Sequence, residues 1–199
     1  MVTVVVEGDT DIPVVREIFK LVGLHFAAPI DARGKSRIDA RIGGYNKAAR
    51  GSPWFVLRDL DHDAECAALL VEQLVPAANR ADLLSLRIAV REAESWLLAD
   101  RAGIAAYLHV SPTLITMNPD SLDDPKREIV GLARRSTRPA IVKGLVPPPG
   151  ASVSVGPEYE GRIIEFAATK WRVSEARKNS PSLERCIRAL RSLKARMPS

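Results

Sequence analysis

The sequence has few of the residues that mark secreted, zinc-binding or membrane-spanning proteins. It contains only two cysteines, Cys66 and Cys186, which show neither a CxxC pattern nor a cysteine–histidine ligand spacing. No run of about 18 uninterrupted apolar residues is present. The start of the chain also lacks the basic region and cleavage site of a secretory signal. We therefore expect a cytoplasmic protein without a membrane span, in which both cysteines are buried as small apolar residues.

Aromatic residues are also scarce, at 5% of the chain, and they form no ladder of the kind that stacks on single-stranded bases. We expect Trp54, Trp96 and Trp171 to belong to the core. Apolar residues make up 46% of the 199 positions, which is enough for one full hydrophobic core and an appendage.

Positive charge is unevenly distributed along the chain. Residues 1–100 carry 12 Lys and Arg against 15 Asp and Glu, a net charge of −3, whereas residues 101–199 carry 17 against 9, a net charge of +8. An acidic half that binds cations beside a basic half that binds phosphates suits a metal-dependent enzyme acting on a polyanion. A solvated basic surface is the simpler reading of the same charges.

Short apolar runs alternate with helical patterns over the first half. Strands are expected at 2–6, 27–30, 54–57 and 84–90, and helices at about 10–22, 36–49 and 64–75. This alternation predicts an α/β fold with a mostly parallel sheet flanked by helices. After residue 100 the strand signal fades, and helices are expected at 124–135, 157–173 and 181–196, separated by the Pro-rich stretch 146–150. We predict a metal-binding α/β domain at 1–100 and a mainly helical, basic extension at 101–199.

Acidic residues directly follow three of the predicted strands. Glu7 follows the first, Asp59, Asp61 and Asp63 follow the third, and the pair Glu92 and Glu94 follows the fourth. Parallel strands bring their carboxyl ends to one edge of the sheet, where ligands bind. Like charges packed together raise each other's pKa unless a cation is present, and carboxylate oxygens suit Mg²⁺ or Mn²⁺. The alternative for Asp61 and Asp63 is capping of the helix expected from Ala64.

Two segments of this pattern resemble a known family. The strings VVVEGDTD and, some fifty residues later, FVLRDLDHD resemble the TOPRIM domain, in which a Glu after the first strand and a DxD after a later one form the metal site. The first string is similar to the V-E-G-x-T-E form of the OLD-like nuclease branch, with Asp11 in place of its last acidic residue. The segment REAESWLLAD at 91–100 is similar to the E-x-W-L-L segment of small stand-alone TOPRIM proteins.

The resemblance implies a fold of the TOPRIM or Rossmann-like kind, and it implies roles for individual residues. Glu7, Asp59 and Asp61 are the implied metal ligands and Glu94 a further acidic contributor, with Glu92 as the alternative to Glu94. Asp11 and Asp63 are candidates for the same or a second metal site. Glu92 and Glu94 also suit the start of a helix, which needs no metal.

Basic residues near the same edge are candidates for phosphate binding. Lys35 and Arg37 follow the second strand and Gly34, which permits close backbone approach. An ordinary exposed helix start explains them equally well. Arg58 suits either pairing with a carboxylate or orientation of substrate. Arginines in the last helix and at 134–138 suit contacts to phosphates without sequence specificity.

The function expected from these observations is Mg²⁺- or Mn²⁺-dependent hydrolysis of nucleic-acid phosphodiester bonds, with DNA favoured over RNA and a separate ATPase subunit as a candidate partner. Two alternatives remain open. One is a non-enzymatic module that binds nucleic acid or an ATPase through its basic half. The other is a haloacid-dehalogenase-like phosphatase, whose DxD motif holds a nucleophilic aspartate but follows the strand nearest the N-terminus.

Overall fold

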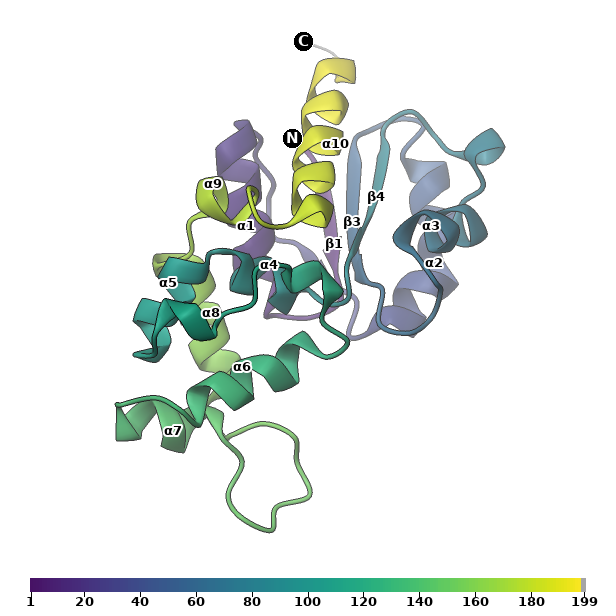
Figure 1. Ribbon diagram of the computed structural model, residues 1–199. Helices are drawn as coiled ribbons and strands as arrows, with labels where there is room; N and C mark the ends of the chain where they lie inside the picture. The colour runs from purple at the N-terminus through teal and green to yellow at the C-terminus, as the bar shows by residue number, and fades with distance from the viewer. Residues whose placement is uncertain (198–199) are drawn as a thin grey trace.

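The computed structural model describes residues 1–197, and within them four strands form one parallel sheet. The strands are β1 (Thr3–Val6), β2 (Ile30–Asp31), β3 (Trp54–Asp59) and β4 (Leu84–Ala89). Their spatial order is β2-β1-β3-β4, and each neighbouring pair runs parallel. The prediction of an α/β fold with a parallel sheet is thus confirmed (Figure 1).

Helices connect the strands and make up about half of the chain. They are α1 (Asp11–Val22), α2 (Lys35–Ala48), α3 (Ala67–Leu74), α4 (Ala93–Ala99), α5 (Arg101–Leu108), α6 (Pro125–Ala133), α7 (Pro139–Leu145), α8 (Tyr159–Thr169), α9 (Val173–Ala176) and α10 (Pro181–Arg196). Short 3₁₀ turns lie at Ala77–Asn79, Pro112–Leu114 and Pro119–Ser121. The predicted start of α10 is confirmed, because Ser180 accepts a hydrogen bond from the Leu183 N–H as its N-cap.

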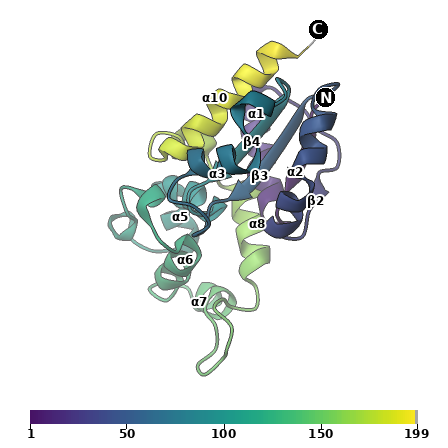
Figure 2. The same cartoon turned by 90° about the vertical axis from the view of Figure 1, so that its right-hand side faces the viewer.

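Side chains that alternate along the strands divide the core into two layers, one on each face of the sheet. On β1, Val4 and Val6 belong to the layer shared with α1 and α10, whereas Val5 belongs to the layer shared with α2 and α3. Figure 2 shows the sheet between these helices. The sheet is therefore the middle of three layers, as its continuous apolar strands predict.

The helices of the second half pack against the sheet through the first of these layers. All seven residues of α4 are buried, and Trp96 on this helix is 0% exposed. The Trp96 indole donates to Ser182 Oγ at 2.7 Å, and the Trp171 indole donates to the Trp96 carbonyl at 3.1 Å. Trp96 and Trp171 are thus core residues, as predicted, while Trp54 is partly buried and stacks on Tyr45.

Several predicted boundaries are wrong for identifiable reasons. The second strand pairs only at Ile30–Asp31, because Pro29 has no N–H to donate to a ladder. The helix predicted from Ala64 begins at Ala67, and the one predicted at 157–173 is α8, which ends at Thr169. Cys186 is buried as expected, but Cys66 is exposed because it lies at the N-cap of α3 instead of inside a helix. None of the helices within residues 1–197 has the length and apolar character needed to cross a lipid bilayer.

Candidate metal centre

The order of the strands creates a crevice where β1 and β3 end. The connection from β1 to β2 passes through α1 on one face of the sheet, and the connection from β3 to β4, at the other edge, passes through α3 on the opposite face. The chain therefore leaves β1 and β3 in opposite directions, and such a switch point is where parallel α/β sheets bind ligands. Glu7 and Asp59 lie at the carboxyl ends of these two strands.

Glu7 and Asp59 are held together by hydrogen bonds to the backbone. Glu7 Oε1 accepts from the Asp59 N–H at 2.9 Å. Asp59 Oδ1 in turn accepts from the Ala93 N–H at 3.0 Å, at the first residue of α4. These two bonds join β1, β3 and α4, so that the two carboxylates expected to meet at one edge of the sheet do meet there.

Three further carboxylates join them from neighbouring elements. Asp11, at the start of α1, is 5% exposed and accepts from the Gly8 N–H at 3.2 Å. Glu94, on α4, is 6% exposed and accepts from the Tyr159 hydroxyl at 3.4 Å. Glu92, at the N-cap position of α4, accepts from the Lys126 N–H at 3.2 Å without capping its own helix. We call Glu7, Asp11, Asp59, Glu92 and Glu94 the carboxylate cluster.

The cluster is buried and short of positive charge. Burial, together with the neighbouring charges of Asp11 and Glu94, raises the pKa of Asp59 well above its ordinary value. Burial and Glu94 raise the pKa of Asp11 to about 7 and that of Glu92 to about 7. Burial also raises the pKa of Glu7. In residues 1–197, the cluster makes a single ion pair, between Lys126 Nζ and Glu94 Oε1 at 3.8 Å.

Asp61 and Asp63 belong to a different arrangement on the other side of β3. Alternation along the strand directs Asp59 toward α1 and α4 and Arg58 toward α2. Arg58 is 2% exposed and binds Asp39 through two hydrogen bonds of 2.8 Å and Asp63 through one of 2.7 Å. Lys35 Nζ lies 2.6 Å from Asp61 Oδ2 and 2.8 Å from Asp63 Oδ2. We call Lys35, Asp39, Arg58, Asp61 and Asp63 the ion-pair network.

The geometry of this network decides two questions that the sequence leaves open. Asp61 and Asp63 do not cap a helix, because α3 begins only at Ala67. Of the two roles considered for Arg58, the structure shows pairing with carboxylates. The turn after β3 places Asp61 at a φ of +47°, in the left-handed region, where its side chain reaches Lys35.

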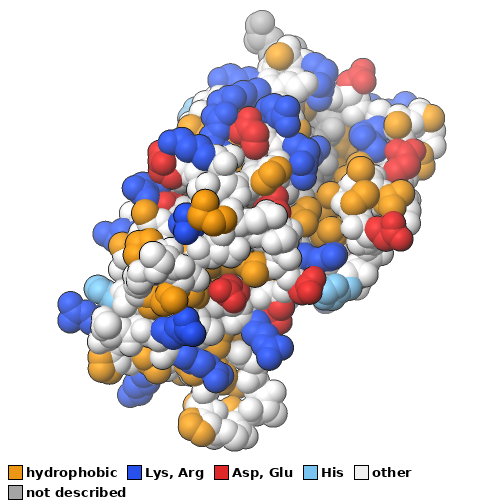
Figure 3. Space-filling model, viewed as in Figure 1, with side chains coloured by type: hydrophobic (Ala, Val, Ile, Leu, Met, Phe, Trp, Pro, Cys, Tyr) orange, Lys and Arg blue, Asp and Glu red, His pale blue; other side chains and the backbone are white. Residues whose placement is uncertain are grey.

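The remaining basic candidates are more dispersed. Arg37 is exposed in the first turn of α2 and does not line the cleft described below. The arginines of the last helix are exposed, and Figure 3 shows Lys and Arg side chains gathered over α10. They also lie outside the cleft. Lys126 and Asp39 were missed by the sequence interpretation, because neither carries a local signal that distinguishes it from other surface charges.

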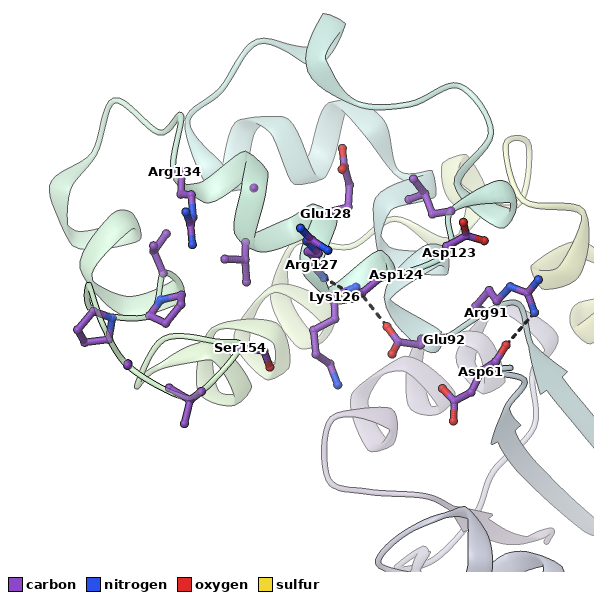
Figure 4. Close-up of a pocket in the computed structure, with 18 of the residues that line it drawn as sticks. Asp61, Arg91, Glu92, Asp123, Asp124, Lys126, Arg127, Glu128, Arg134 and Ser154 are labelled. Carbon is purple, nitrogen blue, oxygen red and sulfur yellow. Dashed lines mark hydrogen bonds between the residues drawn. The ribbon is translucent and has the colours of Figure 1, made fainter. Parts of the chain in front are cut away.

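A large cleft adjoins the carboxylate cluster. It has a volume of about 1760 Å³ and extends from Asp61 and Glu92 at the sheet edge to α6, α7 and the loop that follows α7. Figure 4 shows Lys126 between Glu92 and the loop residue Ser154. Arg127, Arg134 and Lys143 line the same space. The cleft thus has acidic groups at the sheet edge and a mixture of basic and acidic groups along the helical side.

The donor chemistry of the cluster fits a hard divalent cation. Its side chains offer only carboxylate oxygens, which are the ligands that Mg²⁺ and Mn²⁺ prefer. Within residues 1–197, no three His, Cys, Asp or Glu side chains are already arranged as a coordination sphere.

Comparisons of this chain with protein-family models, with curated proteins and with solved structures find no match. The likeness to TOPRIM proteins therefore rests on the residues quoted from the sequence. The arrangement of the cluster and the cleft is described from the structure alone.

Proposed function

We propose that this chain is a Mg²⁺- or Mn²⁺-dependent nuclease that hydrolyses phosphodiester bonds in nucleic acid, with DNA as the favoured substrate. One observation carries the proposal. Carboxylates at the ends of β1 and β3 and on α1 and α4 converge at the switch point of a parallel sheet, and Glu92 at the edge of this cluster lines a cleft that also contains lysines and arginines. Such a site offers a place for a divalent ion and, next to it, a place for phosphates.

Glu7 and Asp59 are the proposed principal ligands, with Asp11 and Glu94 as further ligands. A bound divalent ion would lower the pKa of a water molecule and neutralise charge on the phosphate. Residues of the chain orient these carboxylates and limit their contact with water. The hydrogen bonds from Asp59 N–H to Glu7 and from Ala93 N–H to Asp59 fix the orientation of the two carboxylates. The burial of Asp11 and Glu94 limits the access of bulk water to the cluster.

Lys126 is the proposed phosphate ligand nearest to the cluster. Its pKa is raised because the charges of Glu94 and Glu92 outweigh the effect of burial, which alone would lower it. Its ammonium group reaches the cluster from α6, a helix on the opposite side of the cleft. A cation in this position can hold a phosphate oxygen beside the carboxylates. Lys35 and Arg37 are secondary candidates, and Lys35 must first leave Asp61.

The test is hydrolysis of end-labelled single- and double-stranded DNA and RNA in Mg²⁺, Mn²⁺ or EDTA. Glu7→Gln and Asp59→Asn are suitable variants, since each retains an oxygen that accepts the backbone hydrogen bond made by the native side chain. Both are expected to lower the rate about 100-fold or more, because metal assistance is worth several kcal/mol. EDTA should abolish cleavage.

Matched controls lie elsewhere on the same molecule. Asp82→Asn changes an exposed aspartate just before β4, at the opposite edge of the sheet, and Glu160→Gln changes an exposed glutamate on α8. Both should retain the wild-type rate. Cleavage that persists in EDTA or in both cluster variants contradicts the proposal. Trapping of an aspartyl-phosphate on Asp59 would instead favour the phosphatase alternative, and binding without any cleavage would favour the non-enzymatic module.

A further inference from the structure

The loop between α7 and α8 is unusual for its lack of charge. From Gly144 to Pro157 the chain contains no Asp, Glu, Lys, Arg or His, although charged residues make up 27% of the whole sequence. The part of this stretch that projects from the molecule is residues 146–155, which we call the uncharged loop (Figures 1 and 2). Pro148 and Pro149 are exposed, and Val153 is 57% exposed.

The uncharged loop is held in place at its base. The Gly156 N–H donates to the Leu145 carbonyl at 2.9 Å, and the Glu158 N–H donates to the Gly144 carbonyl at 2.9 Å. The two arms approach so closely that a Cβ atom at Gly156 would lie 2.4 Å from the Gly144 oxygen. Three consecutive prolines further restrict the backbone. The loop is therefore a positioned wall of the cleft instead of a freely moving connection.

This wall faces groups of opposite character across the cleft. Residues 146–151, 153 and 154 line one side. The other side is lined by α6 and its ends, which carry basic groups (Lys126, Arg127, Arg134) interspersed with acidic ones (Asp123, Asp124, Glu128) (Figure 4). A nucleic-acid strand likewise has a charged part, its phosphates, and an uncharged part, the apolar faces of its bases. In a continuous duplex the base faces are stacked and hidden, so an uncharged wall has little to contact. In a single strand they are accessible.

We propose that the uncharged loop contacts the bases of an unpaired strand while α6 binds its phosphates, so that the cleft selects single-stranded or frayed nucleic acid over intact duplex. This inference rests on the proposed nuclease function and names its substrate class. The loop has no aromatic side chain, and its contacts are those of proline and valine, which pack against bases as apolar wedges do in other complexes.

The test compares two fluorescent probes of equal length in Ca²⁺, which replaces Mg²⁺ so that binding is measured without relying on hydrolysis. One is single-stranded DNA, and the other is the same backbone with abasic sites, which keeps the phosphates and removes the bases. Wild type should bind the DNA about fivefold more tightly than the abasic strand, because only the bases offer apolar surface that the loop can bury. A blunt duplex should bind more weakly than the single strand.

Variants separate the two walls of the cleft. Val153→Asp and a triple change of residues 147–149 to serine should each reduce affinity for the DNA to that for the abasic strand, with Val153→Thr as the shape-matched control. Arg134→Met should weaken both probes alike, because it removes a phosphate contact. Circular dichroism establishes whether each variant is folded. If the triple variant does not fold, Val153→Asp alone is sufficient for the test.

Equal binding of the two probes by wild type, or binding of neither, overturns the inference. So does an equal loss for both probes in Val153→Asp. These outcomes are distinct from failure of the proposed function. Binding that depends on bases, without hydrolysis, would refute the proposed nuclease activity but support the role of the uncharged loop. Hydrolysis with binding that does not depend on bases would support the nuclease activity but refute the role of the loop.

Discussion

Two groups of acidic residues meet at one edge of the sheet and differ in how their charge is balanced. In the ion-pair network, Lys35 and Arg58 contact Asp39, Asp61 and Asp63 at 2.6 to 2.8 Å. In the carboxylate cluster, five acidic side chains share one ion pair within residues 1–197, at 3.8 Å. The pKa of Asp63 is accordingly lowered, chiefly by its hydrogen bond from Lys35, whereas the pKa of Asp59 is raised.

The three aspartates at positions 59, 61 and 63 therefore belong to two different arrangements, although they are close in sequence. Asp59 faces α1 and α4 and lacks a cation, so that its charge is available to a metal ion. Asp61 and Asp63 already form ion pairs with Lys35 of α2, and Asp63 also pairs with Arg58 of β3. These ion pairs hold the start of α2 against the end of β3. In this structure the charges of the network are balanced by ion pairs, whereas those of the cluster are largely unbalanced.

The largest expected effect on stability is that of breaking the network at its buried cation. Arg58→Met removes the guanidinium that binds Asp39 and Asp63 and leaves both carboxylates without this partner. We expect the free energy of unfolding to fall by about 3 kcal/mol, as measured by urea denaturation. Arg185→Met, at an exposed position on α10, is the control and should change stability by less than about 0.5 kcal/mol. A loss as small as the control's would mean that the network does not support the fold.

A second prediction uses pH to separate the two groups. An acid whose pKa is raised on folding holds a proton that the unfolded chain has released, so stability falls as pH rises from the unfolded pKa to the folded one. For Asp11 this window runs from 3.8 to about 7. We expect metal-free protein to lose about 2 kcal/mol of stability between about pH 5 and pH 7. The stability contributed by the network has the opposite dependence on pH. Because the pKa of Asp63 is lowered on folding, this stability is lost only when the pH falls below the ordinary pKa of an aspartate.

Asp11→Asn isolates the contribution of the cluster to this slope. The amide oxygen still accepts the Gly8 N–H but carries no charge, so the variant should be more stable than wild type at pH 7 and less dependent on pH. Mn²⁺ should flatten the slope of wild type, because the ion stabilises the ionised carboxylates. An unchanged slope in Asp11→Asn would contradict the assignment of uncompensated charge to the cluster.

The smallest effect is expected at the more exposed cation of the network. The side chains of Lys35, Asp61 and Asp63 are 34%, 31% and 33% exposed, so that solvent screens their attraction. Lys35→Met should cost about 0.5 to 1 kcal/mol in thermal denaturation and raise the pKa of Asp63 observed by NMR. Lys20→Met, which removes a surface pair with Glu17, serves as the baseline. A loss as large as that of Arg58→Met would mean that the network is less solvated than its exposure indicates.

The sequence was sufficient to predict the four strands, the helices between them and α10, and to predict that Glu7 and Asp59 meet at one edge of the sheet. Short apolar strands followed by Glu7 and Asp59 are local patterns, and the rule that parallel strands end at one edge brings these residues together. The bounds of α10 were also predictable, because Ser180, Pro181 and the apolar spacing of Leu183, Ile187 and Leu190 are all visible in one segment.

The partners of these residues were not predictable, because they depend on packing between distant segments. Asp39 reaches Arg58 only when α2 lies against β3, and Lys126 reaches Glu94 only when α6 lies near α4. The separation of Asp61 from Asp59 depends on the turn after β3, where the N–H groups of Leu60 and Asp61 donate to the Arg91 carbonyl. No periodicity in the sequence encodes these contacts.

The position of α10 has a consequence for how the molecule is made. All four strands and the whole carboxylate cluster lie within residues 1–94. The helix whose apolar side covers one face of the sheet, α10, begins only at Pro181. During translation, Val4, Val6 and their neighbours remain without this cover while the intervening helices emerge from the ribosome. The acidic edge of the sheet therefore acquires its final surroundings only after α10 has been synthesised.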